Sequence, residues 1–529
     1  MPKLSEPTKV LINNFEKWRS SLQPKENAPT IHVDEVASKV AAFYEKIRGI
    51  IDWKEEHLLK RRAIERILKR KILMEENNIA ESLVLELIRG GHFPNDRIEE
   101  EKITRVEKTI KKYIFILNNA RVEEKKIHLY TWLSEIAACE IEEILSPSLR
   151  ERALINYMFE TLKQRIQLTE RILKIKRVSD KEKNTQTYIA VQRALFNLDG
   201  PVISYHLLKY YYPDWKDLSA ERLKEITANI EKIKRNLEKS LNHPLSDKFY
   251  QIAEKYDTPY LLLGDVLSED TSIKDKIYSP QEIEKATTRS YEKRVKTLKK
   301  RLGRAAFYAT LSIFLTNIFS LLLIEIPFNK WVTGYFFNFF AMGIDIAVPT
   351  LIMFLLVVTI KPPGRENLPK VIMETMKIVY SQEKQDVYEI KTFRKKNIVF
   401  STIINLFYSI GFLIILLLII WALSKISFPP LSYVIFIIFL SLIAFAGARI
   451  RQRAKELQII EERETIYHLL IDPFAVPVVQ LGKWLTIKWK RYNIIAVFFS
   501  ALIDMPFTVF VEFIEQWRYF LKEKKEKIH

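Results

Sequence analysis

Four long apolar stretches constrain the fold of this chain more than any other feature of its sequence. A helix needs about 20 apolar residues to cross the hydrocarbon core of a bilayer. The stretches contain 20, 30, 26 and 23 residues, and the only charge within them is that of Asp345. They are Ala305–Ile324, Trp331–Ile360, Ile398–Leu423 and Ile426–Ala448. The sequence therefore predicts an integral membrane protein with four transmembrane helices.

The distribution of Lys and Arg predicts the orientation of these spans. The segment Arg294–Arg304 before the first span is strongly basic, and the 361–397 connection holds nine basic residues. The other two connections have only Lys330 and Lys425 nearby. Because basic loops stay in the cytoplasm, we expect the N-terminal 300 residues, the 361–397 loop and both termini to be cytoplasmic. The expected location is the inner (cytoplasmic) membrane of a bacterial cell.

The C-terminal part admits two interpretations. Asn493–Phe513 is apolar enough for a fifth span, but this would place a lysine-rich tail outside. The stretch before it mixes aromatic and basic residues, a pattern that suits the headgroup level: Lys483, Trp484, Lys488, Trp489, Lys490 and Arg491. We expect 471–520 to be interfacial or re-entrant and broken near Asp504–Pro506, with a fifth span as the alternative.

The first 300 residues show helical periodicity, with breaks such as Ser146–Pro147 and Asp199–Pro201 and no alternating run typical of a strand. The predicted fold class is therefore all-α: a helical cytoplasmic region, a four-span bundle and a C-terminal interfacial or re-entrant segment. The expected divisions are an N-terminal arm (1–30), a helical cytoplasmic domain (31–279), a charged linker helix (280–304), the transmembrane domain (305–448) and a cytoplasmic or interfacial C-terminal segment (449–529).

Motifs for catalysis or cofactor binding are missing from the sequence. It contains neither GxxxxGK[ST] nor GxGxxG, and none of its eight His residues forms HExxH. Its one cysteine, Cys139, excludes an intramolecular disulfide and any zinc site built from several Cys, and its apolar helical setting favours buried packing. We therefore expect no cofactor, no metal and no enzymatic activity.

Two clusters in the cytoplasmic region suggest binding surfaces. A helix with seven basic residues in twelve could face anionic lipid headgroups or a partner, and nucleic acid is the weaker alternative: Lys60, Arg61, Arg62, Arg66, Lys69, Arg70 and Lys71. An aromatic cluster follows, for which core packing at a helix end is favoured over a partner-binding patch: Tyr205, Tyr210, Tyr211, Tyr212 and Trp215.

Asp345 is the sharpest functional signal. A carboxylate in the membrane is costly unless it is protonated, paired or hydrated, and Pro349, four residues later, removes a backbone hydrogen bond. Together they suit an ion or proton site. If Trp331–Met342 forms an interfacial helix instead, Asp345 lies near the outer surface. Glu325, outside the apolar stretches, is expected at the headgroup level.

The segment DEVASKVAAFYEKIRGIIDWKEEHLLKRRAIERILKRKIL (Asp34–Leu73), followed by a multi-span C-terminal half, resembles uncharacterised membrane proteins of candidate-phyla bacteria with small genomes. This resemblance implies a bacterial setting and no activity.

Three hypotheses for function follow. The favoured one is a non-enzymatic scaffold or assembly subunit that docks cytoplasmic protein partners through its helical domain. The second is a homo-oligomeric channel or transporter that uses Asp345, because four spans are few for a monomeric transporter. The third is a membrane-tethered enzyme with an unrecognised site.

Overall fold

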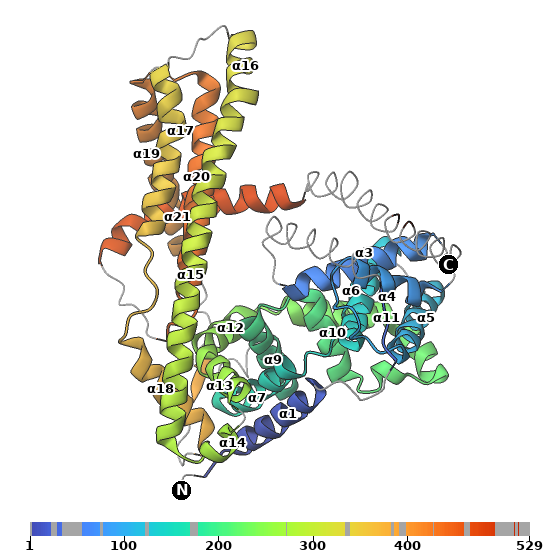
Figure 1. Ribbon diagram of the computed structural model, residues 1–529. Coiled ribbons are helices and arrows are strands. Elements are labelled where there is room, and N and C mark those ends of the chain that lie inside the picture. Colours follow the sequence, from blue (N-terminus) through green and yellow to red (C-terminus); the bar gives the residue numbers. More distant parts are fainter. Residues whose placement is uncertain are drawn as a thin grey trace, which may run out of the picture. The chain divides into compact units, whose positions relative to one another are not determined.

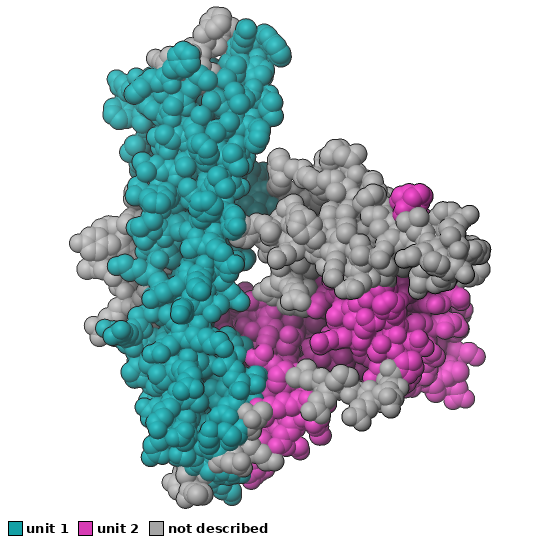
Figure 2. Space-filling view, in the orientation of Figure 1, with its two compact units in different colours: residues 1–4, 258–383, 391–494 teal, residues 5–257, 384–390, 495–529 magenta. Residues whose placement is uncertain are grey.

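The computed structural model confirms an all-α architecture (Figure 1). The chain divides into two compact units, shown in different colours in Figure 2 and described separately below. The structure describes residues 3–22, 29–33, 56–74, 78–121, 126–169, 178–270, 272–333, 339–381, 386–390, 398–426, 428–459 and 466–491, together with Phe513 and Trp517. The amphipathic pattern of Asp34–Trp53 and the apolar segment 493–512 lie outside these residues.

The N-terminal unit spans residues 5–257 and also contains residues 384–390 and 495–529. Its helices are α1 (Glu6–Leu22), α3 (Glu56–Leu73), α4 (Ile79–Arg89), α5 (Glu101–Asn119), α6 (Lys126–Leu145), α7 (Leu149–Arg165), α9 (Asp180–Phe196), α10 (Gly200–Tyr211), α11 (Ala220–Leu241) and α12 (Ser246–Lys255), with a short 3₁₀ turn at Trp215–Asp217. Their apolar faces pack into a core that includes Leu83, Ile136, Met158 and Trp215.

Helix boundaries in this unit follow from capping residues. The side chain of Ser179 accepts a hydrogen bond from the Glu182 amide at 3.2 Å, and Glu182 reciprocates by accepting from the Ser179 amide at 2.9 Å. This capping box satisfies two amides that the first turn of α9 would otherwise leave without partners. Asp199 caps α10, and Pro201 occupies its first turn.

Residues 1–30 were expected to form an N-terminal arm. This prediction is wrong for residues 6–22, which form helix α1 packed against α7. Thr8, Leu11 and Phe15 are buried at helical spacing, and the Thr8 and Tyr157 hydroxyls are 3.0 Å apart. Pro7 does not interrupt this helix, because it lies in the first turn, where the missing amide has no partner within the helix.

The structure also contains two strands that the sequence did not predict. β1 (Ile166–Leu168) and β2 (Tyr388–Ile390) pair in parallel, with Ile166 opposite Tyr388. Three residues are too few for an alternating pattern to be read. The pairing also joins segments more than 200 residues apart, so local periodicity carries no trace of it.

The second unit contains residues 1–4, 258–383 and 391–494. Its elements are α13 (Asp257–Glu269), α14 (Ile273–Lys276), α15 (Pro280–Ser320), a π-helical turn at Leu321–Glu325, α16 (Ile326–Phe328), a π-helical turn at Asn329–Thr333, α17 (Phe339–Val358), α18 (Asn367–Val379), α19 (Ile398–Ser424), α20 (Pro430–Ala454) and α21 (Ile466–Arg491). Residues 258–279, expected in the cytoplasmic domain, belong to this unit.

Four helices in this unit are long and apolar enough to cross a membrane, as the sequence predicts. They correspond to α15 with its π-helical extension, α17, α19 and α20. The charged segment 280–304 continues into the first of them without a break, because α15 is a single 41-residue helix. Within the 30-residue stretch Trp331–Ile360, the structure describes α17 over Phe339–Val358, and residues 334–338 lie outside the described part of the chain.

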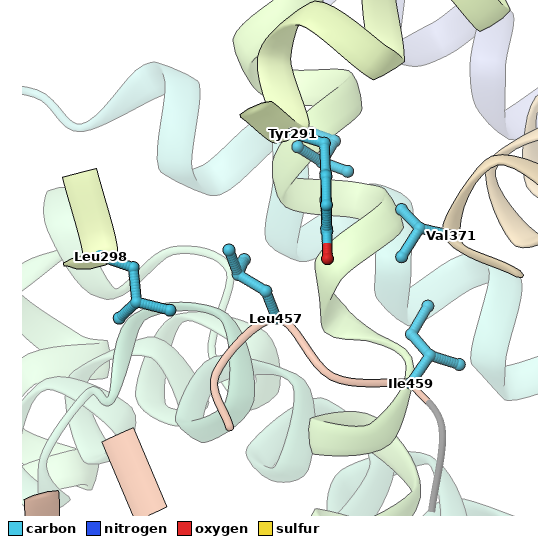
Figure 3. Close-up of a cluster of buried hydrophobic side chains, with 6 residues drawn as sticks. Tyr291, Leu298, Val371, Leu457 and Ile459 are labelled. Atoms are coloured by element: carbon cyan, nitrogen blue, oxygen red, sulfur yellow. The ribbon is translucent and has the colours of Figure 1, made fainter. Parts of the chain in front are cut away.

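The side chain of Asn367, on α18, connects α18 to α15 and to the segment after α20. These bonds lie at the charged end of α15. The Asn367 amide donates to the Tyr291 hydroxyl at 3.0 Å and to the Leu457 carbonyl at 2.5 Å, and its oxygen accepts from the Ile459 amide at 2.9 Å. Around it lies an apolar cluster that includes Leu298 and Val371 (Figure 3). Asn367 is buried, and these bonds use both its amide protons and its oxygen.

Two glycines allow helices to approach α20 closely. A Cβ atom on Gly482 of α21 would collide with the Ser441 carbonyl oxygen of α20. A Cβ atom on Gly447 of α20 would collide with the Leu356 side chain of α17. In Figure 1, α21 crosses the other helices of the bundle, whose axes are roughly parallel. The crossing therefore depends on the absence of a side chain at Gly482.

We predict that Gly482→Ala destabilises the second unit by about 1–3 kcal/mol. The added methyl group collides with the backbone of Ser441, so the two helices must separate. Thermal unfolding of the detergent-solubilised full chain measures the effect. The matched control is Gly343→Ala on α17, where a Cβ atom meets nothing within 4 Å. Equal stability of the two variants would contradict the close α20–α21 contact.

Candidate functional site: buried carboxylates in the membrane helices

Asp345 lies two turns into α17, and its side chain is only 1% exposed. Pro349, which the structure places inside the same helix, has no amide proton to give to the Asp345 carbonyl. The side-chain amide of Asn317, on α15, donates a hydrogen bond to this carbonyl. Asn317 thus supplies the donor that Pro349 removes, and it ties the first span to the second.

Two oxygen atoms at this junction have no hydrogen-bond donor among the described residues. They are Oδ2 of Asp345 and Oδ1 of Asn317. Asn317 is fully buried, and a buried polar atom without a partner costs about 1–3 kcal/mol. The pair of acceptors is therefore an arrangement that a proton or a cation would stabilise.

Glu325 is the second carboxylate of the site, and it too is fully buried. The Ser432 hydroxyl of α20 donates to Glu325 Oε2 at 2.5 Å, and the Ser320 hydroxyl donates to Oε1 at 3.3 Å. Both acids contact neighbouring membrane helices, because Asn317 of α15 bonds the Asp345 carbonyl and Ser432 of α20 bonds Glu325. The structure buries Glu325 between helices, and its expected depth at the headgroup level stays a prediction.

The backbone around Glu325 departs from regular α-helix. Residues Leu321–Glu325 form a π-helical turn in which the Ile326 amide donates to the Leu321 carbonyl. Pro327 follows within the next turn and cannot donate a hydrogen bond. Such wide turns are frequent at functional sites, and this one carries Glu325, which bonds Ser432 of α20.

The chemistry of the side chains favours a proton or a hard cation over a transition metal. Within the described residues, no three His, Cys, Asp and Glu side chains cluster in a way that could hold a metal ion. The available groups are carboxylate, amide and hydroxyl oxygens, the type of ligand that hard cations prefer. Neither Asp345 nor Glu325 forms an ion pair with any residue that the structure describes.

Comparisons with known proteins do not assign this site. No protein-family model, curated protein or solved structure matches the chain.

The basic helix α3 does not present a free face of seven cations. Arg61 is only 3% exposed and forms a two-pronged ion pair with Asp199. Lys69 pairs with Glu65 at 2.6 Å, while Arg70 and Lys71 pair with Glu86 at 2.5 and 3.5 Å. Of the seven, Arg62 is exposed, and Lys60 and Arg66 are half-buried. Arg61 is therefore a structural residue, and it does not belong to the expected lipid- or partner-binding face.

The aromatic–basic segment forms the C-terminal part of α21. Lys483 and Lys488 are exposed, and Trp484 is 56% exposed. The backbone of Trp489, Lys490 and Arg491 continues the helix, and their side chains lie outside the described set. Asp504 and Pro506 also lie outside it, so the expected break there stays a prediction.

The remaining clusters pack largely as expected. Cys139 is buried, and burial raises the pKa of its thiol well above the ordinary value. Trp215 and Tyr205 are core residues, whereas Tyr210 is 43% exposed. Asn317 and Ser432 were not among the residues expected at a site. An Asn within an apolar span was the signal for Asn317, because such polar residues usually bond a neighbouring helix.

We predict that Asn317→Ala destabilises the protein by about 1–3 kcal/mol, because the Asp345 carbonyl loses its donor. In a Pro349→Ala background the cost is smaller by about 1 kcal/mol, because the alanine introduced there provides an amide for the same carbonyl. The free energies of unfolding of the two single variants and the double variant, measured in detergent, give this coupling. An equal cost of Asn317→Ala in both backgrounds would show that the two residues do not act on one carbonyl.

Proposed function

We propose that this chain is a membrane protein whose helices bind a monovalent cation or a proton at Asp345 and Glu325, as part of its movement across the bilayer. The observation that carries the proposal is the pair of buried carboxylates without basic partners among the described residues, together with the Asp345 Oδ2 and Asn317 Oδ1 atoms that lack donors there. Ionisable groups within membrane segments characteristically mark ion pathways and proton relays.

The geometry supports a site of oxygen ligands held by three spans. Asn317 belongs to α15, Asp345 to α17 and Ser432 to α20. An ion that sheds its hydration shell needs such oxygens in exchange. Because each ligand comes from a different helix, small relative movements of the helices change the strength of binding.

The proposed orientation follows from the charges in the sequence. The basic segments before α15 and after α20, together with the 361–397 loop, place both termini in the cytoplasm under the positive-inside rule. This puts the carboxylates toward the opposite face, because Glu325 and Ser432 lie at the ends of their spans away from the basic segments. With only four spans, we expect the protein to work as a homo-oligomer.

The scaffold hypothesis and the tethered-enzyme hypothesis stay predictions, because no contact among the described residues bears on a docked partner or on a substrate. The expected interactions with anionic headgroups and with cytoplasmic proteins also stay predictions.

We predict that Asp345→Asn lowers cation or proton flux by about tenfold or more in liposomes containing the purified full-length protein. The substitution keeps the shape of the side chain but removes the charge that attracts the ion. Dyes sensitive to sodium, potassium and pH report the flux. Asp270→Asn, at an exposed position outside the spans, is the control and should leave the flux unchanged.

A second measurement separates loss of binding from loss of folding. Sodium or potassium chloride should raise the unfolding temperature of the wild-type protein relative to choline chloride, because a ligand that binds only the folded state stabilises it. Size-exclusion chromatography checks that Asp345→Asn still assembles. Wild-type liposomes no more permeable than empty ones, or full flux through Asp345→Asn, would overturn the proposal.

A further inference from the structure

The N-terminal unit contains a small pocket that is used by none of the functions discussed above. Its volume is about 150 Å³, and it opens between α7, α9 and α10. Pockets for drug-sized ligands start at about 300 Å³, so this one suits a small polyatomic ion. The polar and aromatic residues around it are Arg152, Asn156, Tyr188, His206, Lys209 and Tyr210.

The charges around the pocket leave an excess of positive charge. Glu143 of α6 accepts from Arg152 Nη1 at 2.5 Å, from Lys209 Nζ at 2.5 Å and from Lys216 Nζ at 3.0 Å. Although burial disfavours its charge, Lys209, Arg152 and Lys216 hold the pKa of Glu143 well below its usual range. Three cations therefore surround one carboxylate, for a net charge of about +2.

Arg152 and Lys209, the two cations that line the pocket, have N–H groups that their bonds to Glu143 do not use. A guanidinium group carries five N–H bonds and an ammonium group three, and the bonds to Glu143 engage one nitrogen of Arg152 and one N–H of Lys209. Glu143 keeps both side chains in place, which lowers the entropy that a ligand must remove on binding. Burial lowers the pKa of Lys209 to about 8, so the amine remains largely protonated at neutral pH.

His206 adds a hydrogen-bond acceptor to this cationic site. The side-chain amide of Gln192 donates to the Tyr188 carbonyl at 3.1 Å, which directs its oxygen to Nδ1 of His206 at 2.5 Å. This oxygen only accepts, so the proton is assigned to Nδ1 and Nε2 carries a lone pair. Burial, with the nearby Lys209, lowers the pKa of His206 to about 3, and the ring is neutral.

We propose that this pocket binds inorganic hydrogen phosphate. The ligand must carry negative charge for Arg152 and Lys209, and a hydroxyl that can donate to Nε2 of His206. Hydrogen phosphate has both at neutral pH, whereas sulfate has no hydroxyl. A phosphomonoester loses its last acidic proton near pH 6 and therefore leaves the histidine without a donor at pH 7.5.

Calorimetric titration of the detergent-solubilised full-length protein tests this assignment. Phosphate, sulfate and phenyl phosphate are added separately at pH 7.5 and constant sodium concentration. We expect phosphate to bind about tenfold or more tightly than either of the others, because neither of them gives a hydrogen-bond donor to the acceptor on His206. No phosphate binding, equal affinities, or tighter binding of phenyl phosphate would overturn the proposal.

Substitutions identify the pocket as the binding site. Arg152→Gln should weaken phosphate binding by about tenfold or more, because a charge-assisted contact is lost. Arg222→Gln is the matched control: its side chain is 38% exposed, against 41% for Arg152, and it pairs with Glu225 away from the pocket. Unchanged affinity in Arg152→Gln would place any phosphate elsewhere. The preference for phosphate over sulfate is measured on the wild-type protein and does not depend on how a His206 variant folds.

Discussion

A backbone carbonyl among apolar membrane helices must find its donor within the protein, because lipid offers none. Pro349 creates such a carbonyl at Asp345, and Asn317 satisfies it from the neighbouring helix. This single bond links the first two spans and holds α17 in register with α15. The position of the carboxylate between the helices follows from the same requirement, since the side chain and the carbonyl belong to one residue.

Elsewhere in the second unit, a few polar or small residues likewise determine how the helices pack. Asn367 uses both its amide protons and its oxygen to join α15, α18 and the segment after α20. Gly447 and Gly482 sit where α20 meets α17 and α21. The chain contains only 12 glycines, and these two occupy contacts in which any side chain would collide. Between such points, apolar side chains fill the interfaces without specifying a single register.

Features encoded locally could be predicted from the sequence, and pairings over long distances could not. The apolar stretches gave the four spans, and breaks such as Asp199–Pro201 gave helix boundaries, because both depend on neighbouring residues. Asp345 and Pro349 were identifiable for the same reason. The donor from Asn317, the β1–β2 pairing and the partner of Arg61 join residues far apart, and one sequence carries no periodic signal for them. The packing of α1 was not predicted, because its partner α7 lies more than 100 residues away in the sequence.

The continuity of α15 has a mechanical consequence. A helix of 41 residues is about 60 Å long at about 1.5 Å per residue, and it contributes Tyr291 and Leu298 to the cluster around Asn367 and Asn317 to the carboxylate site. If one end of such a helix stays in place, a tilt of about 5° displaces the other end by about 5 Å. The packing around Asn317 and the packing around Asn367 are thus connected by one continuous helix.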